Sequence, residues 1–182
     1  MKTRVCILLI LALILSISCS KSTSEPEALS IEDLLVKNNE LAGWTYGGER
    51  WVARNSTELF AEINGAGDVN IRNGFQEGAS QDYEGTINAA TVMLKLTIFD
   101  QTTNANARTV YEDPDTGMGG AVPWVDGAGE EARYLSTSLS TTLTFYRDKY
   151  YVLLNIGSGL DEALNVLKQF ALNVDGKILD NE

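Results

Sequence analysis

The sequence predicts an α+β domain, a mainly antiparallel β-sheet with helices packed on it, including a long amphipathic C-terminal helix. Three patterns carry this prediction. Apolar and polar residues alternate along 87–99, as in a half-buried strand. Residues 141–147 and 150–156 are two strand-like runs separated by two residues, which indicates a tight hairpin. Apolar residues recur at three- and four-residue spacing from Leu160 to Val174, which indicates the helix.

Capping pairs mark the first two helices that we expect. Ser30 with Asp33 predicts a short helix, and Asn55 with Glu58 predicts the next one. The buried face of this second helix is expected to carry Leu59, Phe60, Ile63 and Ala66. The glycines on either side of Ala66 predict a kink or the close approach of another element, and Gly74 a stop.

Further strands are expected at 44–52, 79–84 and 133–137. In the strand at 87–99, one face is expected to carry Val92, Leu94, Leu96 and Ile98, and the other Thr91, Met93, Lys95 and Thr97. Residues 100–112 are weakly helical, and 112–131 form an acidic, glycine-rich loop.

The last helix is expected to start at a capping box of Ser158 and Asp161 and to end at Gly176. Gly157-Ser158-Gly159 also stands at a strand-to-helix turn, the position of a nucleophile elbow. The flanking pattern of such an elbow is missing, so we interpret Ser158 as a helix cap.

The first 18 residues have the form of an export signal. Lys2 and Arg4 precede an apolar run at 5–17, which is shorter than the roughly 20 residues of a membrane-spanning helix. Leu15-Ser16-Ile17-Ser18-Cys19 resembles the lipobox of bacterial lipoproteins. This resemblance implies cleavage after residue 18 and acyl chains, such as palmitate, on Cys19. By the sorting rule of these lipoproteins, Ser20 implies the outer membrane if the organism has one.

The cysteine count agrees with this interpretation. Cys6 lies inside the leader, so Cys19 has no disulfide partner in the exported chain. The alternative is an ordinary signal peptide that leaves an unused thiol. We therefore divide the chain into a signal peptide (1–18), a lipidated cysteine with a flexible tether (19–29) and a single α+β domain (30–182).

The charge of the exported chain restricts its partners. Of 14 basic residues two lie in the leader, which leaves 12 against 25 acidic residues, a net charge of −13. Such a surface repels nucleic-acid phosphates and anionic lipid head groups. No nucleic-acid partner is expected, and membrane contact is expected through the lipid anchor on Cys19 alone.

A second resemblance covers most of residues 41–174. Gly43-Trp44, Glu58-Leu59-Phe60, Ile63-Asn64-Gly65-Ala66 with Asp68, and Gly74-Phe75 resemble the pattern of an uncharacterised family of exported bacterial proteins. The chain differs from that family at Gly67 and Asn70. The resemblance implies a location and an architecture but no activity. The order of elements is also similar to the PsbP-like α/β sandwich.

Common catalytic chemistry is missing from the sequence. Histidine is absent, and acylation of Cys19 removes the thiol, so Ser-His-Asp and Cys-His sites cannot form. We predict no catalytic residues and no cofactor. Two carboxylates could still hydrolyse a glycosidic bond, although nothing selects a pair among 25 acids. Asp113, Asp115 and Asp126 are weak calcium candidates, because the loop lacks the ligand spacing of an EF-hand.

Aromatic residues in glycine-rich segments offer a possible binding surface, made of Trp44, Tyr46, Trp51 and Trp124. The alternative is that Trp44 and Trp51 cover an edge of the core. Asn64 and Asp68 are four residues apart and could form a small polar notch, or Asn64 could satisfy a helix bend.

We therefore expect a non-catalytic binding or accessory lipoprotein of the cell envelope, which contacts an envelope protein or a small ligand. The first alternative is a carboxylate-dependent hydrolase acting on envelope glycans. The second is a purely structural envelope component.

Overall fold

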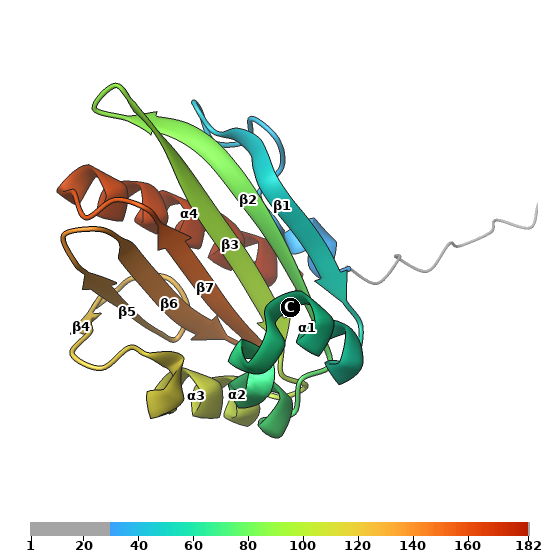
Figure 1. The fold of residues 1–182 in the computed structure, drawn as a ribbon. Helices are drawn as coiled ribbons and strands as arrows, with labels where there is room; N and C mark the ends of the chain where they lie inside the picture. The colour runs from blue at the N-terminus through green and yellow to red at the C-terminus, as the bar shows by residue number, and fades with distance from the viewer. Residues whose placement is uncertain (1–29, 182) are drawn as a thin grey trace, which may run out of the picture.

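The computed structural model describes residues 30–181. The leader, Cys19 and the tether lie outside these residues. The described chain forms a seven-stranded antiparallel sheet with helices packed on it (Figure 1). The fold class that the sequence predicts is confirmed. The strands lie in the order β1-β2-β3-β7-β6-β5-β4.

The sheet contains strands β1 (Thr45–Ala53), β2 (Glu77–Ile87), β3 (Ala90–Asp100), β4 (Val122–Pro123), β5 (Glu131–Ser136), β6 (Thr141–Arg147) and β7 (Tyr150–Ile156). The helices are η1 (Ile31–Leu34), α1 (Ser56–Ile63), η2 (Asn64–Gly67), α2 (Asp68–Arg72), α3 (Asn104–Glu112), η3 (Pro114–Thr116) and α4 (Asp161–Leu179). The 112–131 segment therefore contains η3 and β4.

One face of the sheet packs against α4 and η1. Leu94, Leu96 and Ile98 of β3 are fully buried there, as the alternation predicts. Phe170 of α4 lies against Trp44 and Tyr83, with ring centroids 5.5 and 5.0 Å apart. The buried apolar stripe of α4 thus packs on this face, mainly against β6 and β7, and Figure 1 shows the helix behind the sheet.

The opposite face is covered only in part. A second apolar cluster packs α1, α2 and α3 against one end of the sheet, where Phe99 and Tyr151 are buried. Figure 1 shows these three helices gathered at the same end of the sheet. The other end of this face, which carries Met93, Lys95 and Asn155, is exposed. One face is thus a closed core, and the other holds a half-covered surface.

The helix that follows Asn55 breaks where the two glycines indicate. Asn55 caps α1 by accepting a hydrogen bond from the Glu58 backbone N–H at 3.0 Å. Leu59 is buried as expected, but Phe60 is 54% exposed, so its assignment to the buried face is wrong. A Cβ on Gly67 would lie 3.2 Å from the Leu59 side chain, which explains why the chain turns tightly here. Leu59 and Ile63 of α1 belong to the apolar cluster on this face of the sheet.

Both predicted ends of the last helix are wrong. Its N-cap is Leu160, whose apolar side chain makes no capping bond, and the Ser158 hydroxyl accepts from the Leu160 backbone N–H at 3.4 Å. The helix also continues through Gly176 to Leu179. Ile178 is buried, and the Lys177 ammonium donates to the Leu35 carbonyl at 2.7 Å. Tertiary packing outweighs the low helix propensity of glycine at this position.

The strand expected at 87–99 is β3, which begins at Ala90, three residues later than predicted. Ile87 ends β2, and Asn88 and Ala89 form the turn, both with positive φ. The hairpin at 141–156 is confirmed with the expected bounds, and Asp148 in its turn has φ 47°.

Candidate functional site

The half-covered face of the sheet holds a pocket of about 320 Å³. It lies between the sheet and the α1–α2 segment, with η3 at one side. It is lined by Trp51, Ile63, Val69, Asn70, Lys95, Thr97, Phe99, Asp115, Thr116, Tyr151 and Leu153. A volume near 300 Å³ is at the lower end of the range of small-molecule sites.

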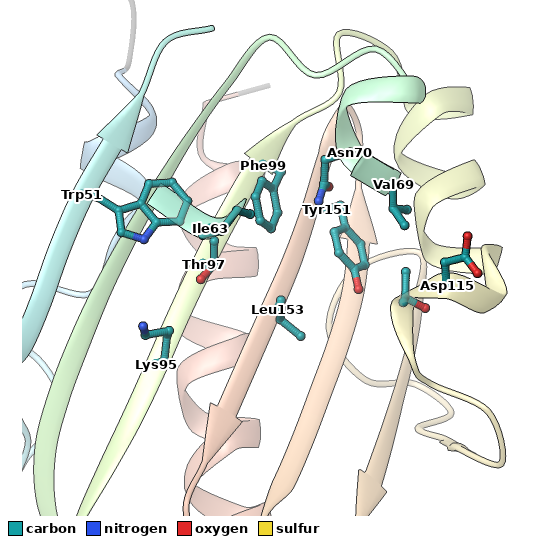
Figure 2. Close-up of a pocket in the computed structure, with 11 residues that line it drawn as sticks. Trp51, Ile63, Val69, Asn70, Lys95, Thr97, Phe99, Asp115, Tyr151 and Leu153 are labelled. Atoms are coloured by element: carbon teal, nitrogen blue, oxygen red, sulfur yellow. The ribbon is translucent and has the colours of Figure 1, made fainter. Parts of the chain in front are cut away.

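Aromatic rings form the inner wall of this pocket. Phe99 and Tyr151 are direct neighbours on β3 and β7, and their rings stack with centroids 6.2 Å apart. The Trp51 ring lies 6.4 Å from Phe99. Figure 2 shows these three side chains along the sheet, with Asn70 and Val69 from α2 beside Tyr151. Burial raises the pKa of Tyr151, so its phenol stays neutral at ordinary pH.

The strand register determines how the lining changes along the sheet. Directly opposed residues of antiparallel strands point to the same face. Gly78, Phe99 and Tyr151 form one cross-strand row, and the next row contains Ser80, Thr97 and Leu153. The row after that contains Asp82, Lys95 and Asn155 and lies beyond the covering helices. The face therefore changes from aromatic to polar within three rows.

Thr97 presents a hydroxyl group to the pocket. The Ser80 hydroxyl donates to the Leu96 carbonyl at 3.1 Å and lies 3.0 Å from the Thr97 hydroxyl, and either hydroxyl can be the donor in this second bond. The bond to Ser80 fixes the position of the Thr97 hydroxyl.

Asn70 is held in place by a buried hydrogen bond. Its side-chain oxygen accepts from Gln101 Nε2 at 2.8 Å, and both residues are buried. This bond joins α2 to the end of β3. It fixes the orientation of the amide that faces the aromatic wall.

An ion-pair cluster fastens η3 beside the pocket. One guanidinium nitrogen of Arg72 lies 2.7 Å from carboxylate oxygens of both Asp113 and Asp115. The Arg72 hydrogen bond lowers the pKa of Asp113. Asp126, the third calcium candidate, lies in the loop between β4 and β5. Within residues 30–181 no three acidic or thiol side chains gather closely enough to hold a metal ion, so the structure does not assemble the calcium site.

The structure does not bring the four predicted aromatics into one surface. Trp51 lines the pocket, whereas Trp44 is buried on the α4 face against Phe170. Tyr46 is 44% exposed beside Tyr83, and Trp124 is half-buried with the Lys168 ammonium 5.2 Å from its ring. Trp44 and Trp51 are both buried, in agreement with the alternative that these two side chains cover the core.

The residues of the predicted polar notch, Asn64 and Asp68, do not line the pocket beside Trp51. Asn64 adopts a positive φ of 51° at the end of α1, and Asp68 begins α2. Both side chains are exposed. The alternative role of Asn64, at a helix bend, fits its place at the junction of α1 and η2.

Several pocket residues were not selected by the sequence patterns. Alternation assigned Lys95 and Thr97 to one face of their strand, but nothing marked that face as the site. Asn70, Tyr151 and Leu153 join the same pocket from two other elements. To find these residues from the sequence, one would have to know that β3 pairs with β7.

Comparison with known proteins supports the fold. No protein-family model matches the chain, and none of the curated proteins compared is similar to it. A solved structure, the extracellular domain of PknH from Mycobacterium tuberculosis, is similar, with a TM-score of 0.51 and 12% sequence identity. The match covers 85% of this chain and 98% of that chain. No helix within residues 30–181 has the length and apolar character needed to cross a bilayer.

Proposed function

We propose that this protein is a non-catalytic binding domain of the cell envelope that takes a small, partly apolar ligand into the pocket beside Trp51. The observation that carries the proposal is the half-open aromatic cavity on an otherwise well-packed sheet. Apolar pockets with a few fixed polar groups are the usual form of small-molecule sites. Thr97 and Asn70 are such groups, since hydrogen bonds fix both.

The composition of the pocket favours binding over hydrolysis. Its lining includes one carboxylate, Asp115, which is paired with Arg72 at 2.7 Å. Glycoside hydrolysis needs two carboxylates about 5–10 Å apart across the substrate. A hydrolase acting on envelope glycans is therefore the weaker candidate for this site.

A pocket-filling variant tests the binding proposal. We expect the neutral fluorophore N-phenyl-1-naphthylamine to bind the wild-type domain saturably, because the aromatic wall excludes water from its rings. Leu153→Trp places a larger side chain in the pocket and should weaken binding about tenfold or more, which corresponds to about 1.4 kcal/mol. Leu172→Trp, at a 51% exposed position on α4, is the matched control and should bind as wild type. Equal affinities in the two variants would refute the site.

The envelope location rests on the lipobox-like segment and is part of the same proposal. We infer that acyl chains on Cys19 hold the domain at a membrane, in the outer membrane if the organism has one. Burial of acyl chains contributes about 0.8 kcal/mol per methylene, so two or three chains anchor firmly. The extracellular origin of the PknH domain is consistent with this location.

Cys19→Ala tests the anchor. The variant should lose fatty-acid labelling and appear in the soluble fraction or as uncleaved precursor. Labelling with an alkyne analogue of palmitate, followed by membrane fractionation, measures both properties. Membrane retention and labelling equal to wild type would exclude Cys19 as the anchor point.

A further inference from the structure

A second hollow lies on the uncovered part of the same sheet face. This hollow is about 500 Å³ and is lined by Asp82, Met93, Lys95, Asn155 and Gly157. Lys95 lines both this hollow and the pocket beside Trp51. We call the pocket beside Trp51 the aromatic chamber and the second hollow the polar strip, and the shared Lys95 makes them neighbours on one face.

The polar strip contains two side chains with hydrogen-bond acceptors, Asn155 and Asp82. The side-chain N–H of Asn155 donates a hydrogen bond to the Thr142 hydroxyl oxygen at 2.8 Å. The side-chain carbonyl oxygen of Asn155 can then accept from a ligand. The buried Oδ1 of Asp82 accepts no hydrogen bond from the described residues and lies 3.6 Å from Lys95 Nζ.

Lys95 is the donor on this strip. Its ammonium lies 3.7 Å from Glu49 and 3.6 Å from Asp82, both longer than a normal hydrogen bond. The side chain is 45% exposed. These long ion pairs leave the ammonium able to donate to a ligand.

A charged head group can pair with only some of the groups on this strip. A sulfate or carboxylate can accept from Lys95 but cannot donate to Asn155 or Asp82, and the acidic surface repels it. An ammonium cannot accept from Lys95 and would lie beside a like charge. A hydroxyl group both donates and accepts, so it can pair with every group on the strip.

We propose, on the basis of the binding function above, that the ligand is an amphiphile with a neutral, hydroxyl-rich head group. Its apolar end occupies the chamber beside Trp51, Phe99 and Tyr151. Its hydroxyls lie over Asp82, Lys95 and Asn155. A glycolipid and a free alkyl polyol share this chemistry.

Three octyl amphiphiles separate head-group recognition from tail binding. Octyl-β-glucoside, octyl sulfate and octyltrimethylammonium are titrated below their micelle concentrations against bound N-phenyl-1-naphthylamine. We expect the glucoside to displace the fluorophore with a dissociation constant at least tenfold lower than either charged compound. Repeating the titration with a short-chain glycolipid and with free glucose distinguishes the lipid from the free sugar as the source of the head group.

Conservative variants locate the head group. Asn155→Leu should weaken glucoside binding about 2- to 12-fold, the range of one net hydrogen bond, and leave fluorophore binding unchanged. Asn165→Leu, on the exposed side of α4, is the matched control.

Equal affinity for all three amphiphiles, with no effect of Asn155→Leu, would overturn the head-group proposal and leave the pocket proposal standing. If neither the fluorophore nor any octyl compound binds, both proposals fail.

Discussion

Gly159→Ala is expected to destabilise the domain by about 3 kcal/mol, at the upper end of the usual cost of overpacking. A Cβ at this position would lie 1.9 Å from the Thr137 carbonyl oxygen and 2.9 Å from the Ser138 carbonyl carbon. Both atoms belong to backbone, so neither can move aside as a side chain would. The turn between β5 and β6 or the start of α4 must shift instead.

Gly157→Ala is the matched control for this prediction. It lies two residues earlier in the same Gly-Ser-Gly segment, and a Cβ there has no atom within 4 Å. Its free energy of unfolding should stay within about 0.5 kcal/mol of wild type. Urea unfolding followed by circular dichroism measures both variants. Similar values for the two would show that the close contact at Gly159 does not limit stability.

Asp175→Ala is expected to cost about 3 kcal/mol, the lower end of the range for breaking a buried ion pair. Asp175 of α4 is 6% exposed and binds Arg147 of β6 through both carboxylate oxygens, one of them 3.1 Å from Nη2. Arg147 also donates to the Gly129 carbonyl at 3.1 Å. Removal of the carboxylate takes away one charge partner of a guanidinium side chain that is 20% exposed.

An exposed pair provides the comparison for Asp175. Glu112 pairs with Arg108 across one turn of α3, and both side chains are 55% exposed. Glu112→Ala should change the free energy of unfolding by less than about 0.5 kcal/mol, since exposed pairs contribute little. Both variants are measured by urea unfolding at pH 7. An Asp175→Ala variant as stable as Glu112→Ala would contradict the account of the buried pair.

The sequence predicts the elements of this fold better than it predicts the site. The alternation from Val92 to Ile98 and the two-residue turn that contains Asp148 are local sequence patterns. The structure contains the strand and the hairpin that these patterns predict. The two ends of α4, at Asp161 and Leu179, depend on tertiary contacts of Gly159 and Lys177. Such contacts leave no local signal in the chain.

The pocket required information that one sequence does not carry. The sequence patterns did not distinguish Trp44 from Trp51, but the two pack on opposite faces of the sheet. Trp44 precedes β1, Trp51 lies within it, and the strand register is irregular between Gly47 and Arg50. Thr97 meets Leu153 only because β3 pairs with β7, more than fifty residues later in the chain. Chamber and strip arise from this pairing and from the helices that cover half of one face.

The indole N–H signals of the three tryptophans test the central claim most directly. Trp51 lines the pocket, Trp44 lies on the opposite face, and Trp124 packs near Lys168 of α4. In a ¹H–¹⁵N spectrum of the domain titrated with N-phenyl-1-naphthylamine, we expect the Trp51 signal to move, with Trp51→Phe providing its assignment. The signals of Trp44 and Trp124 should stay in place. Movement of either of these, with Trp51 unchanged, would contradict a ligand site between the sheet and α1–α2.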